Sequence, residues 1–403
     1  MIRERIFGVR RIASELWTGG RGWILVGVAS GWFLSLGVRL IFPALLPYIR
    51  DEFALNFSII GLLVSTLWVA YALGQFPGGI IGDRIGEGNA LVASTVCSGF
   101  AIVVVTVSWT LRLLFIATAV FGLSTALFGP ARFTILSAIY DEKDGTAIGL
   151  TLSAGEAGNA ILPVIAGGLA TAVSWRAGFG VTVPAFFLVA ALIFWTIPSR
   201  VSEGNDGYSF SLSTLRYVLD SITDRLILLI SSIHFLLFFV YQGFTGFYPT
   251  YLVEAKGVSP GVAATLFGWF FVIGILVQPA AGAGGDRLGV RPTLLVVAAV
   301  STIALGILPF VHGTLGLVLV TTVASTLLGS TPLTQTYLVN KLPETVSGTG
   351  LGLLRTVYIG LGATGPVVVG AIADRGFFDV AFFGLAAVAA ISIVASLSLP
   401  KSE

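Results

Sequence analysis

Long apolar runs, separated by short polar segments, make up most of the chain between residues 23 and 398. A helix satisfies its own backbone hydrogen bonds in hydrocarbon, and about 17–25 apolar residues are enough for it to cross a bilayer. The pattern therefore predicts an all-α integral membrane protein. Twelve transmembrane helices are expected, at 23–48, 57–81, 90–109, 111–137, 146–172, 178–198, 226–252, 260–283, 292–311, 315–339, 349–373 and 378–398.

Polar segments divide these helices into two sets of six. The longest polar segment, 199–225, is predicted to be a cytoplasmic linker between an N-terminal bundle at 23–198 and a C-terminal bundle at 226–398. Residues 1–22 are basic with a ragged apolar face, and we interpret them as an uncleaved cytoplasmic tail that lies near the membrane surface. Residues 399–403 are interpreted as a second cytoplasmic tail.

Basic residues are distributed unevenly between the two sides of the predicted membrane. If the N-terminus is inside, 14 Lys and Arg residues fall on the inner side and 5 on the outer side. Cytoplasmic segments carry the excess of Lys and Arg in multi-pass proteins. We therefore expect a protein of the cell membrane with both termini in the cytoplasm.

Composition agrees with lipid as the main solvent of the chain. Of the 403 residues, 56% are hydrophobic and 10% are charged, and the mean hydropathy is +0.96. This is more apolar surface than a single soluble core could bury. A net charge of +2 gives no indication of a nucleic-acid partner. One cysteine excludes an internal disulfide, and two distant histidines make a metal site or an enzyme unexpected. No cofactor is expected, and the protein is predicted to be a monomer.

A glycine-rich loop occurs twice, with 203 residues between the copies. Residues 79–86 (GIIGDRIG) and 282–289 (GAGGDRLG) each follow the second predicted helix of a set of six. Chance repetition of one loop would not extend along the chain, yet the same offset holds elsewhere. It pairs Gly145 with Gly348, Gly149 with Gly352, Pro163 with Pro366, Gly167 with Gly370, and Phe179 with Phe382. The chain is therefore predicted to consist of two parallel structural repeats.

Twelve spans, a central linker and a Gly-x-x-x-Asp-Arg-x-Gly loop after helices 2 and 8 resemble the major facilitator superfamily (MFS) of secondary transporters. Residues 158–168 (GNAILPVIAGG) are also similar to that family's Gly-x-x-x-x-Pro-x-x-Gly-Gly helix. The resemblance covers nearly the whole chain. It implies two pseudo-symmetric six-helix bundles, which expose a central site to each side of the membrane in turn.

The same resemblance implies that the paired loops close the cytoplasmic side. An aspartate there can cap a neighbouring helix, and an arginine can bridge helix ends of the two halves. The alternative is a tight turn with solvated charges. The predicted cytoplasmic gate consists of Gly79, Asp83, Arg84, Gly86, Gly282, Asp286, Arg287, Gly289, Arg291 and Arg132. The family usually has basic residues just after the first loop, where this chain has Glu87, Gly88 and Asn89, while the second copy retains only Arg291; the gate of the first half is therefore expected to be the weaker one.

Ionisable side chains inside a span are costly in hydrocarbon, and each is a candidate functional group. Arg39, Arg132 and Arg355 lie within predicted helices, and Glu156 is the one carboxylate well inside a predicted span. Guanidinium groups bind carboxylate and phosphate through two parallel hydrogen bonds, so this positive excess predicts an anionic substrate. Arg39 and Arg355 are predicted to bind it. The alternatives are that Arg39 extends to the outer surface and that Arg355 forms a structural pair.

Two residues are candidates for proton coupling. Glu156 could load and release a proton within the membrane, unless an arginine holds it ionised in a permanent salt bridge. His234 is the second candidate, because histidine titrates near neutral pH. Tyr241 and Tyr248 follow His234 at seven-residue intervals and are predicted to line the substrate site, with helix packing as the alternative. Gln335 is added to the substrate site because the offset pairs it with Arg132.

These features predict a secondary active transporter that moves a small organic anion by alternating access, with coupling to protons. Its partners would be the anion, protons and the lipid bilayer. One alternative is proton-driven efflux of amphipathic or drug-like compounds. Such exporters usually carry an arginine four residues before a glycine in helix 4, where this chain has Thr118 ahead of Gly122. A second alternative is a membrane sensor that has a transporter fold but does not transport.

Overall fold

The computed structural model describes residues 16–17, 20–140, 144–197, 223–341 and 347–400, without the side chains of Asp83, Asn340 and residues 347–352. All regular secondary structure in these ranges is helical. Twelve spans are long and apolar enough to cross a membrane, as predicted. The predicted linker and most of the N-terminal tail fall outside the described residues, so the domain boundaries given above stay predictions.

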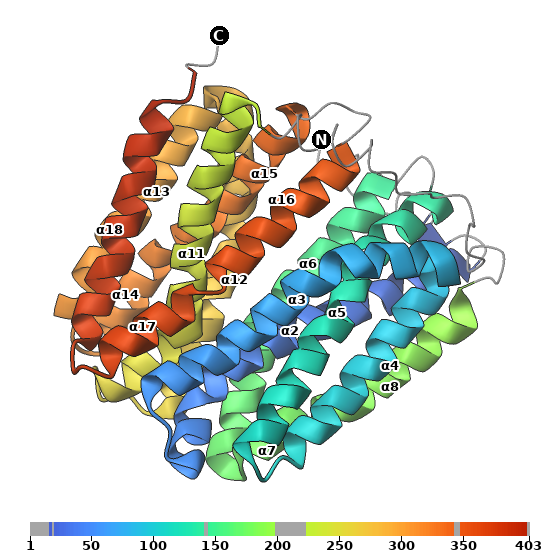
Figure 1. Cartoon of the computed structure of the whole chain (residues 1–403), viewed down its shortest axis with the longest axis horizontal. Coiled ribbons are helices and arrows are strands. Elements are labelled where there is room, and N and C mark those ends of the chain that lie inside the picture. The colour runs from blue at the N-terminus through green and yellow to red at the C-terminus, as the bar shows by residue number, and fades with distance from the viewer. Residues whose placement is uncertain (1–15, 18–19, 141–143, 198–222, 342–346, 401–403) are drawn as a thin grey trace, which may run out of the picture.

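The helices form two groups, which Figure 1 shows in blue to green and in yellow to red. The first group contains α2 (Arg21–Phe53), α3 (Phe57–Ile85), α4 (Glu87–Thr106), α5 (Leu111–Ile139), α6 (Asp144–Ala172), α7 (Trp175–Gly180) and α8 (Thr182–Thr196). The second contains α11 (Arg225–Glu254), α12 (Pro260–Leu288), α13 (Val290–Ile307), η2 (Leu308–Phe310), α14 (Thr314–Ala324), η3 (Ser325–Gly329), α15 (Ser330–Lys341), α16 (Ser347–Gly362), α17 (Gly365–Ala373) and α18 (Phe378–Leu397). Large apolar side chains such as Leu188, Leu276 and Val394 are about 70% exposed, as suits contact with lipid.

The two copies of the glycine-rich loop have the same backbone conformation. Gly86 ends α3 with φ 84° and ψ 145°, and Gly289 ends α12 with φ 93° and ψ 155°. Residues with a side chain rarely adopt this region, so glycine is needed for the immediate turn into α4 and α13. The 203-residue offset in the sequence is therefore also a repeat of local structure.

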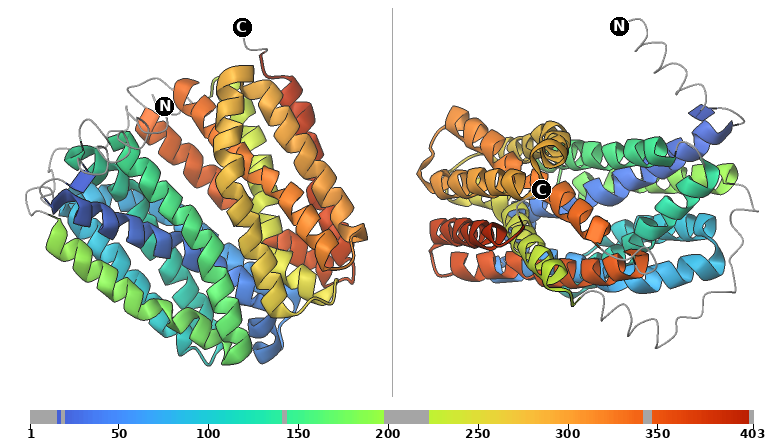
Figure 2. Two further views of the ribbon diagram at one scale, coloured as in Figure 1. Left: turned by 180° about the vertical axis from the view of Figure 1, so that it is seen from behind. Right: turned by 90° about the horizontal axis from the view of Figure 1, so that it is seen from above.

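The two halves pack against each other at the end opposite these turns, which we call the closed end. Here α3 lies beside α17, and α12 lies beside α6. A Cβ atom on Gly61 would lie 2.5 Å from the Pro366 carbonyl oxygen, and one on Gly167 would clash with the Ala264 Cβ. Gly61 lies 203 residues before Ala264, so equivalent positions of α3 and α12 contact the opposite half, although their partners Pro366 and Gly167 differ by four residues, about one helical turn, in the repeat. The ribbons diverge from the closed end towards the glycine-rich turns, which mark the open end (Figures 1 and 2).

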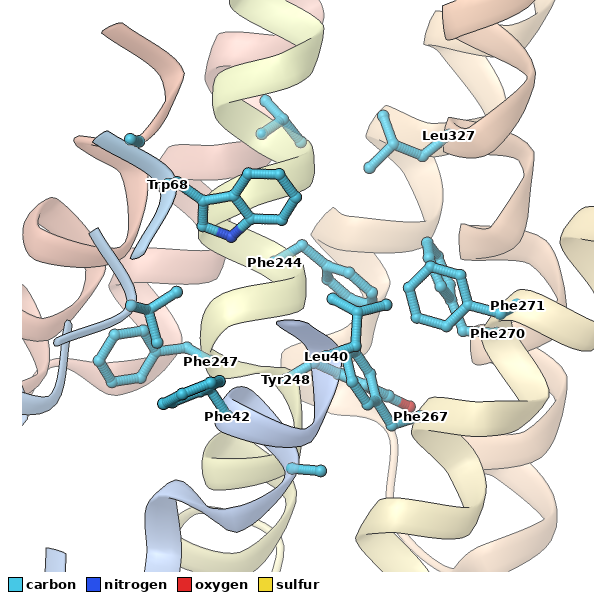
Figure 3. Close-up of a cluster of buried hydrophobic side chains, with 14 of the residues drawn as sticks. Leu40, Phe42, Trp68, Phe244, Phe247, Tyr248, Phe267, Phe270, Phe271 and Leu327 are labelled. Atoms are coloured by element: carbon cyan, nitrogen blue, oxygen red, sulfur yellow. The ribbon is translucent and has the colours of Figure 1, made fainter. Parts of the chain in front are cut away.

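A buried apolar cluster joins the halves near the closed end (Figure 3). Phe244 of α11 packs against Phe270 of α12, with ring centroids 5.0 Å apart. Leu40 and Phe42 of α2 and Trp68 of α3 belong to the same cluster. Trp68 meets Phe238 of the other half edge to face, with centroids 6.4 Å apart. Together these side chains form an apolar layer between the closed end and the middle of the molecule, which we call the apolar floor.

Candidate functional site

A cavity of about 170 Å³ lies between the two halves and is lined by both. Five of the residues predicted to contact substrate or protons share this wall: Arg39, Glu156, Tyr241, Gln335 and Arg355. The full lining is Trp32, Leu36, Arg39, Leu40, Trp68, Tyr71, Glu156, Asn159, Phe238, Tyr241, Gln278, Leu328, Thr331, Gln335, Arg355, Tyr358 and Ile359. Residues that are far apart in sequence therefore form one mixed aromatic and charged site.

Arg39 occupies the wall on the side of α2. Its side chain is 2% exposed, so it does not extend to the outer surface. The guanidinium lies 3.8 Å from the centroid of the Tyr71 ring, and Nη2 donates a 3.0 Å hydrogen bond to Ser35 Oγ. Cation–π contact of this kind stabilises a cation without neutralising it. The Nε of Arg39 is buried and has no hydrogen-bond partner among the described residues.

Arg132, predicted to belong to the gate, lies behind the cavity wall. Its guanidinium is 3.2 Å from the centroid of the Trp32 ring and 4.3 Å from that of Phe133. The residue is 3% exposed, and its Nη1 has no partner within the described part of the chain. Trp32 therefore separates Arg132 from the cavity. Arg39 lies 5.6 Å from the centroid of the same ring.

Glu156 of α6 faces the cavity from the first half. Its Oε2 accepts a 3.3 Å hydrogen bond from Asn159, and the carboxyl group also interacts with Gln278 of α12, across the two halves. No ion pair joins Glu156 to an arginine among the residues that the structure describes. The permanent salt bridge considered as an alternative is therefore not formed in this conformation.

Arg355 of α16 faces the cavity from the second half. It interacts with the neighbouring Tyr358, and its Nε has no partner among the described residues. Gln335 of α15 donates a 3.2 Å hydrogen bond to the Tyr358 hydroxyl. Gln335, Tyr358 and Arg355 thus form a polar patch opposite Arg39 in the cavity wall.

His234 and Tyr248 are not among the residues that line the cavity. His234 is buried behind Phe238 and Tyr358, and its Nδ1 is 2.5 Å from Thr334 Oγ1. The Tyr248 hydroxyl is hydrogen-bonded to Thr321, and its ring stacks on Phe244 (Figure 3). Seven residues advance a helix by about 10 Å, so a stripe that reaches the cavity at Tyr241 has passed it at Tyr248.

The gate residues whose side chains the structure describes do not join the two halves in this conformation. Arg84, Asp286 and Arg287 are exposed, and none forms an ion pair with another described residue. A Cβ atom on Gly79 or Gly282 would meet nothing within 4 Å. Arg291 is partly exposed, and the side chain of Asp83 lies outside the described residues. Any gating role of these loops therefore belongs to a different conformation.

Polar contacts at the closed end were not predicted from the sequence. Arg50 Nη1 of α2 lies 2.7 Å from Glu254 Oε1 of α11. Asp374, which follows α17, accepts hydrogen bonds from the backbone N–H groups of Phe57 (2.6 Å) and Ser58 (2.9 Å) at the start of α3. Charged residues beside loops give no sequence signal that separates a solvated side chain from one that links two halves. Together with the apolar floor, these contacts close the cavity towards this end.

Comparison with known proteins identifies the family. The sequence profile of the Major Facilitator Superfamily matches residues 27–221 and 230–403. The chain belongs to this superfamily. The family is one of transporters rather than enzymes, and the superfamily assignment agrees with the twelve helical spans.

Curated MFS relatives are distant but cover much of the chain. A hexuronate transporter of Bacillus subtilis (strain 168) is 24% identical over 86% of this chain and 88% of its own. A probable sulfoacetate transporter, SauU, of Cupriavidus necator is 23% identical over 91% and 90%. The membrane sensor protein UhpC of Escherichia coli (strain K12) is 24% identical over 66% and 64%. A crystal structure of a mutant of the nucleoside transporter NupG superposes with a TM-score of 0.79 at 14% identity, over 93% of this chain and 99% of that one.

Proposed function

We propose that this MFS protein moves a small organic anion across the cell membrane by alternating access, coupled to protons. The observation that carries this proposal is the cavity itself. Arg39 of the first half and Arg355 of the second line one small space, and the Nε of each lacks a partner among the described residues. A carboxylate or phosphate would supply the missing acceptors.

The position of the arginines also links binding to movement. An empty cavity leaves two cations from different halves in electrostatic repulsion. An anion between them would reverse that interaction and favour an arrangement in which both halves approach it. A ligand shifts a conformational equilibrium only through such differential contacts. Binding would therefore favour closure of the open end around the substrate.

The names of two relatives support an anion as cargo. Hexuronate and sulfoacetate are both organic anions, and each relative matches most of this chain. The excess of basic residues on one predicted side supports placing the termini and the open end in the cytoplasm. The conformation would then be open to the cytoplasm and closed to the outside.

Glu156 is the proposed proton carrier. The groups that contact its carboxyl are the neutral amides of Asn159 and Gln278, so protonation would break no ion pair with a described residue. Gln278 belongs to the opposite half, so movement of the halves would change the environment of the carboxyl. A proton could thus be bound in one conformation and released in the other.

Flux through purified protein in proteoliposomes tests the proposal. Wild-type protein should take up at least one small carboxylate, sulfonate or phosphate ester, and an uncoupler should abolish accumulation. Arg39→Gln should reduce uptake on the order of 10- to 100-fold, since hydrogen bonds to a charged group are lost. Arg112→Gln is the matched control, because Arg112 is exposed at the start of α5. Unchanged uptake by Arg39→Gln would remove Arg39 from the site.

A membrane sensor is the second candidate, favoured by the match to UhpC. A sensor would bind the anion through the same arginines but would not release it on the other side. Binding measured by thermal shift in detergent, with no flux of the same anion in proteoliposomes, would support this candidate.

A further inference from the structure

Three guanidinium groups lie close enough to one another around the cavity to interact electrostatically. Arg39, Arg132 and Arg355 come from α2, α5 and α16, and each is close enough to repel the other two electrostatically. The side chain of Tyr71, on α3, interacts with all three. Tyr71 was absent from the predicted site, yet it marks the point at which the positive charges meet.

Negative charge in this region is scarce. Among the residues that the structure describes, Glu156 is the one carboxylate in the cavity wall, and its partners are the amides of Asn159 and Gln278 rather than an arginine. The region therefore carries two positive charges in excess with Glu156 ionised, and three with Glu156 protonated. Buried charges in proteins are normally paired. Contacts with Trp32, Trp68 and Tyr71 hold the cations in place but leave this net charge unchanged.

We infer that the substrate is a small dianion, and this inference rests on the anion transport proposed above. A dianion neutralises the excess that remains when Glu156 is ionised, whereas a monoanion leaves a repelling positive charge. The geometry provides one guanidinium from each half, so Arg39 and Arg355 can each bind anionic oxygens. Arg132, behind Trp32, adds to the field without touching the cavity. A volume of about 170 Å³ is below the range usual for drug-sized ligands, which fits a compact dianion.

Matched ligand pairs test the number of charges separately from the presence of charge. Oxalate, malonate, succinate and glycerol phosphate are each compared with their monomethyl esters, as competitors of binding to the purified full chain at pH 7.5 and of flux in proteoliposomes. The best dianion should bind about tenfold or more tightly than its own monoester. Equal or tighter binding of the monoester would overturn the dianion while leaving anion transport intact. Absence of binding and flux for all of these anions would overturn both proposals.

Two variants test which residues determine the preference for a second negative charge on the substrate. Arg355→Gln should weaken the best dianion on the order of 10- to 100-fold and its monoester much less, which would remove the preference. Gln335→Glu adds a carboxylate beside Tyr358 and should shift the preference towards the monoester while keeping all three arginines. Gln335→Met is the neutral control for the loss of the amide. If Gln335→Glu and Gln335→Met keep the same preference for the dianion, net charge does not set specificity and the inference is wrong. Melting temperatures of all variants show whether each remains folded.

Discussion

Asp374 caps α3 from the opposite half of the protein, with its carboxylate 2.9 Å from the backbone nitrogen of Ser58. The first N–H groups of a helix lack partners within the helix, and a carboxylate at that end is favoured by the helix dipole. Asp374 therefore stabilises the closed end through a bond that exists only while the two halves touch. Because Asp374 follows α17 in the second half, its hydrogen bonds to α3 break when the two halves separate at this end.

Asp374→Asn should weaken the closed end. Asparagine keeps one acceptor oxygen but loses the charge, and we expect a loss of about 1 kcal/mol, or roughly a fivefold rise in the population open at this end. Double electron–electron resonance between labels at Val173→Cys and His312→Cys, in a Cys97→Ala background, would report the separation. Asp51→Asn is the control, because Asp51 is an exposed carboxylate in the last turn of α2, at the closed end of the same molecule. No change for Asp374→Asn relative to this control would contradict the assigned role.

The pH dependence of this contact follows from the environment of the carboxyl. Partial burial raises the pKa of Asp374, but hydrogen bonds from Ser58 and Phe57 outweigh burial and hold the pKa below its usual value. The ionised form is thus favoured in the closed state. Its contribution is fully present above about pH 4, the ordinary range of an aspartate, and is lost as the pH falls through the lowered pKa. Between pH 5 and pH 8, therefore, any change in the spin-label distances should be the same in the wild-type protein and in Asp374→Asn. A wild-type shift in that range that Asp374→Asn abolishes would refute this.

Gly268 permits the close contact of α12 with α6. A Cβ atom there would lie 2.6 Å from the Ala160 carbonyl oxygen and would clash with Val164 Cγ2. Gly268→Ala should open the closed end and slow transport, with an overpacking penalty of about 1–3 kcal/mol. Gly168→Ala is the control, because a Cβ there meets nothing within 4 Å. Initial uptake rates and spin-label distances would test this, and equal behaviour of the two variants would show that the contact is not limiting.

The sequence predicted the parts of the site that hydrophobic patterning exposes. Arg39, Glu156 and Arg355 could be recognised because a charged side chain inside an apolar span is energetically costly and is usually retained for function. Tyr71 and Gln278 were missed because an uncharged polar residue in a helix has no comparable signal, and its orientation depends on how the helices pack. Tyr248 was predicted to line the substrate site but lies outside the cavity lining. Helical spacing predicts which residues share a face, but it does not predict the depth at which the cavity ends.

The two glycine-rich loops are predicted to contribute unequally. Beyond the loop that contains Asp286 lies Arg291, whereas the loop that contains Asp83 is followed by Glu87 and the uncharged Gly88 and Asn89. Asp286→Asn should therefore reduce the initial rate of uptake several-fold, and Asp83→Asn should reduce it less. Asp286 is exposed in this conformation, so its replacement should leave the melting temperature within about 1 °C, consistent with surface substitutions being nearly neutral. The reverse order of the two rates would contradict the predicted asymmetry.

Glu156 provides the test of proton coupling. Glu156→Gln keeps the shape of the side chain and the contact with Asn159, but it cannot bind and release a proton. We expect exchange of substrate across the membrane to continue, because exchange needs no net proton movement, while accumulation driven by a pH gradient is lost. The measurement is counterflow and pH-driven uptake in the same proteoliposomes. Asn159→Ala is the comparison, since it disturbs the hydrogen bond without removing the carboxyl and should retain pH-driven uptake. If accumulation survives in Glu156→Gln, the proton is carried elsewhere, and His234 becomes the next group to replace.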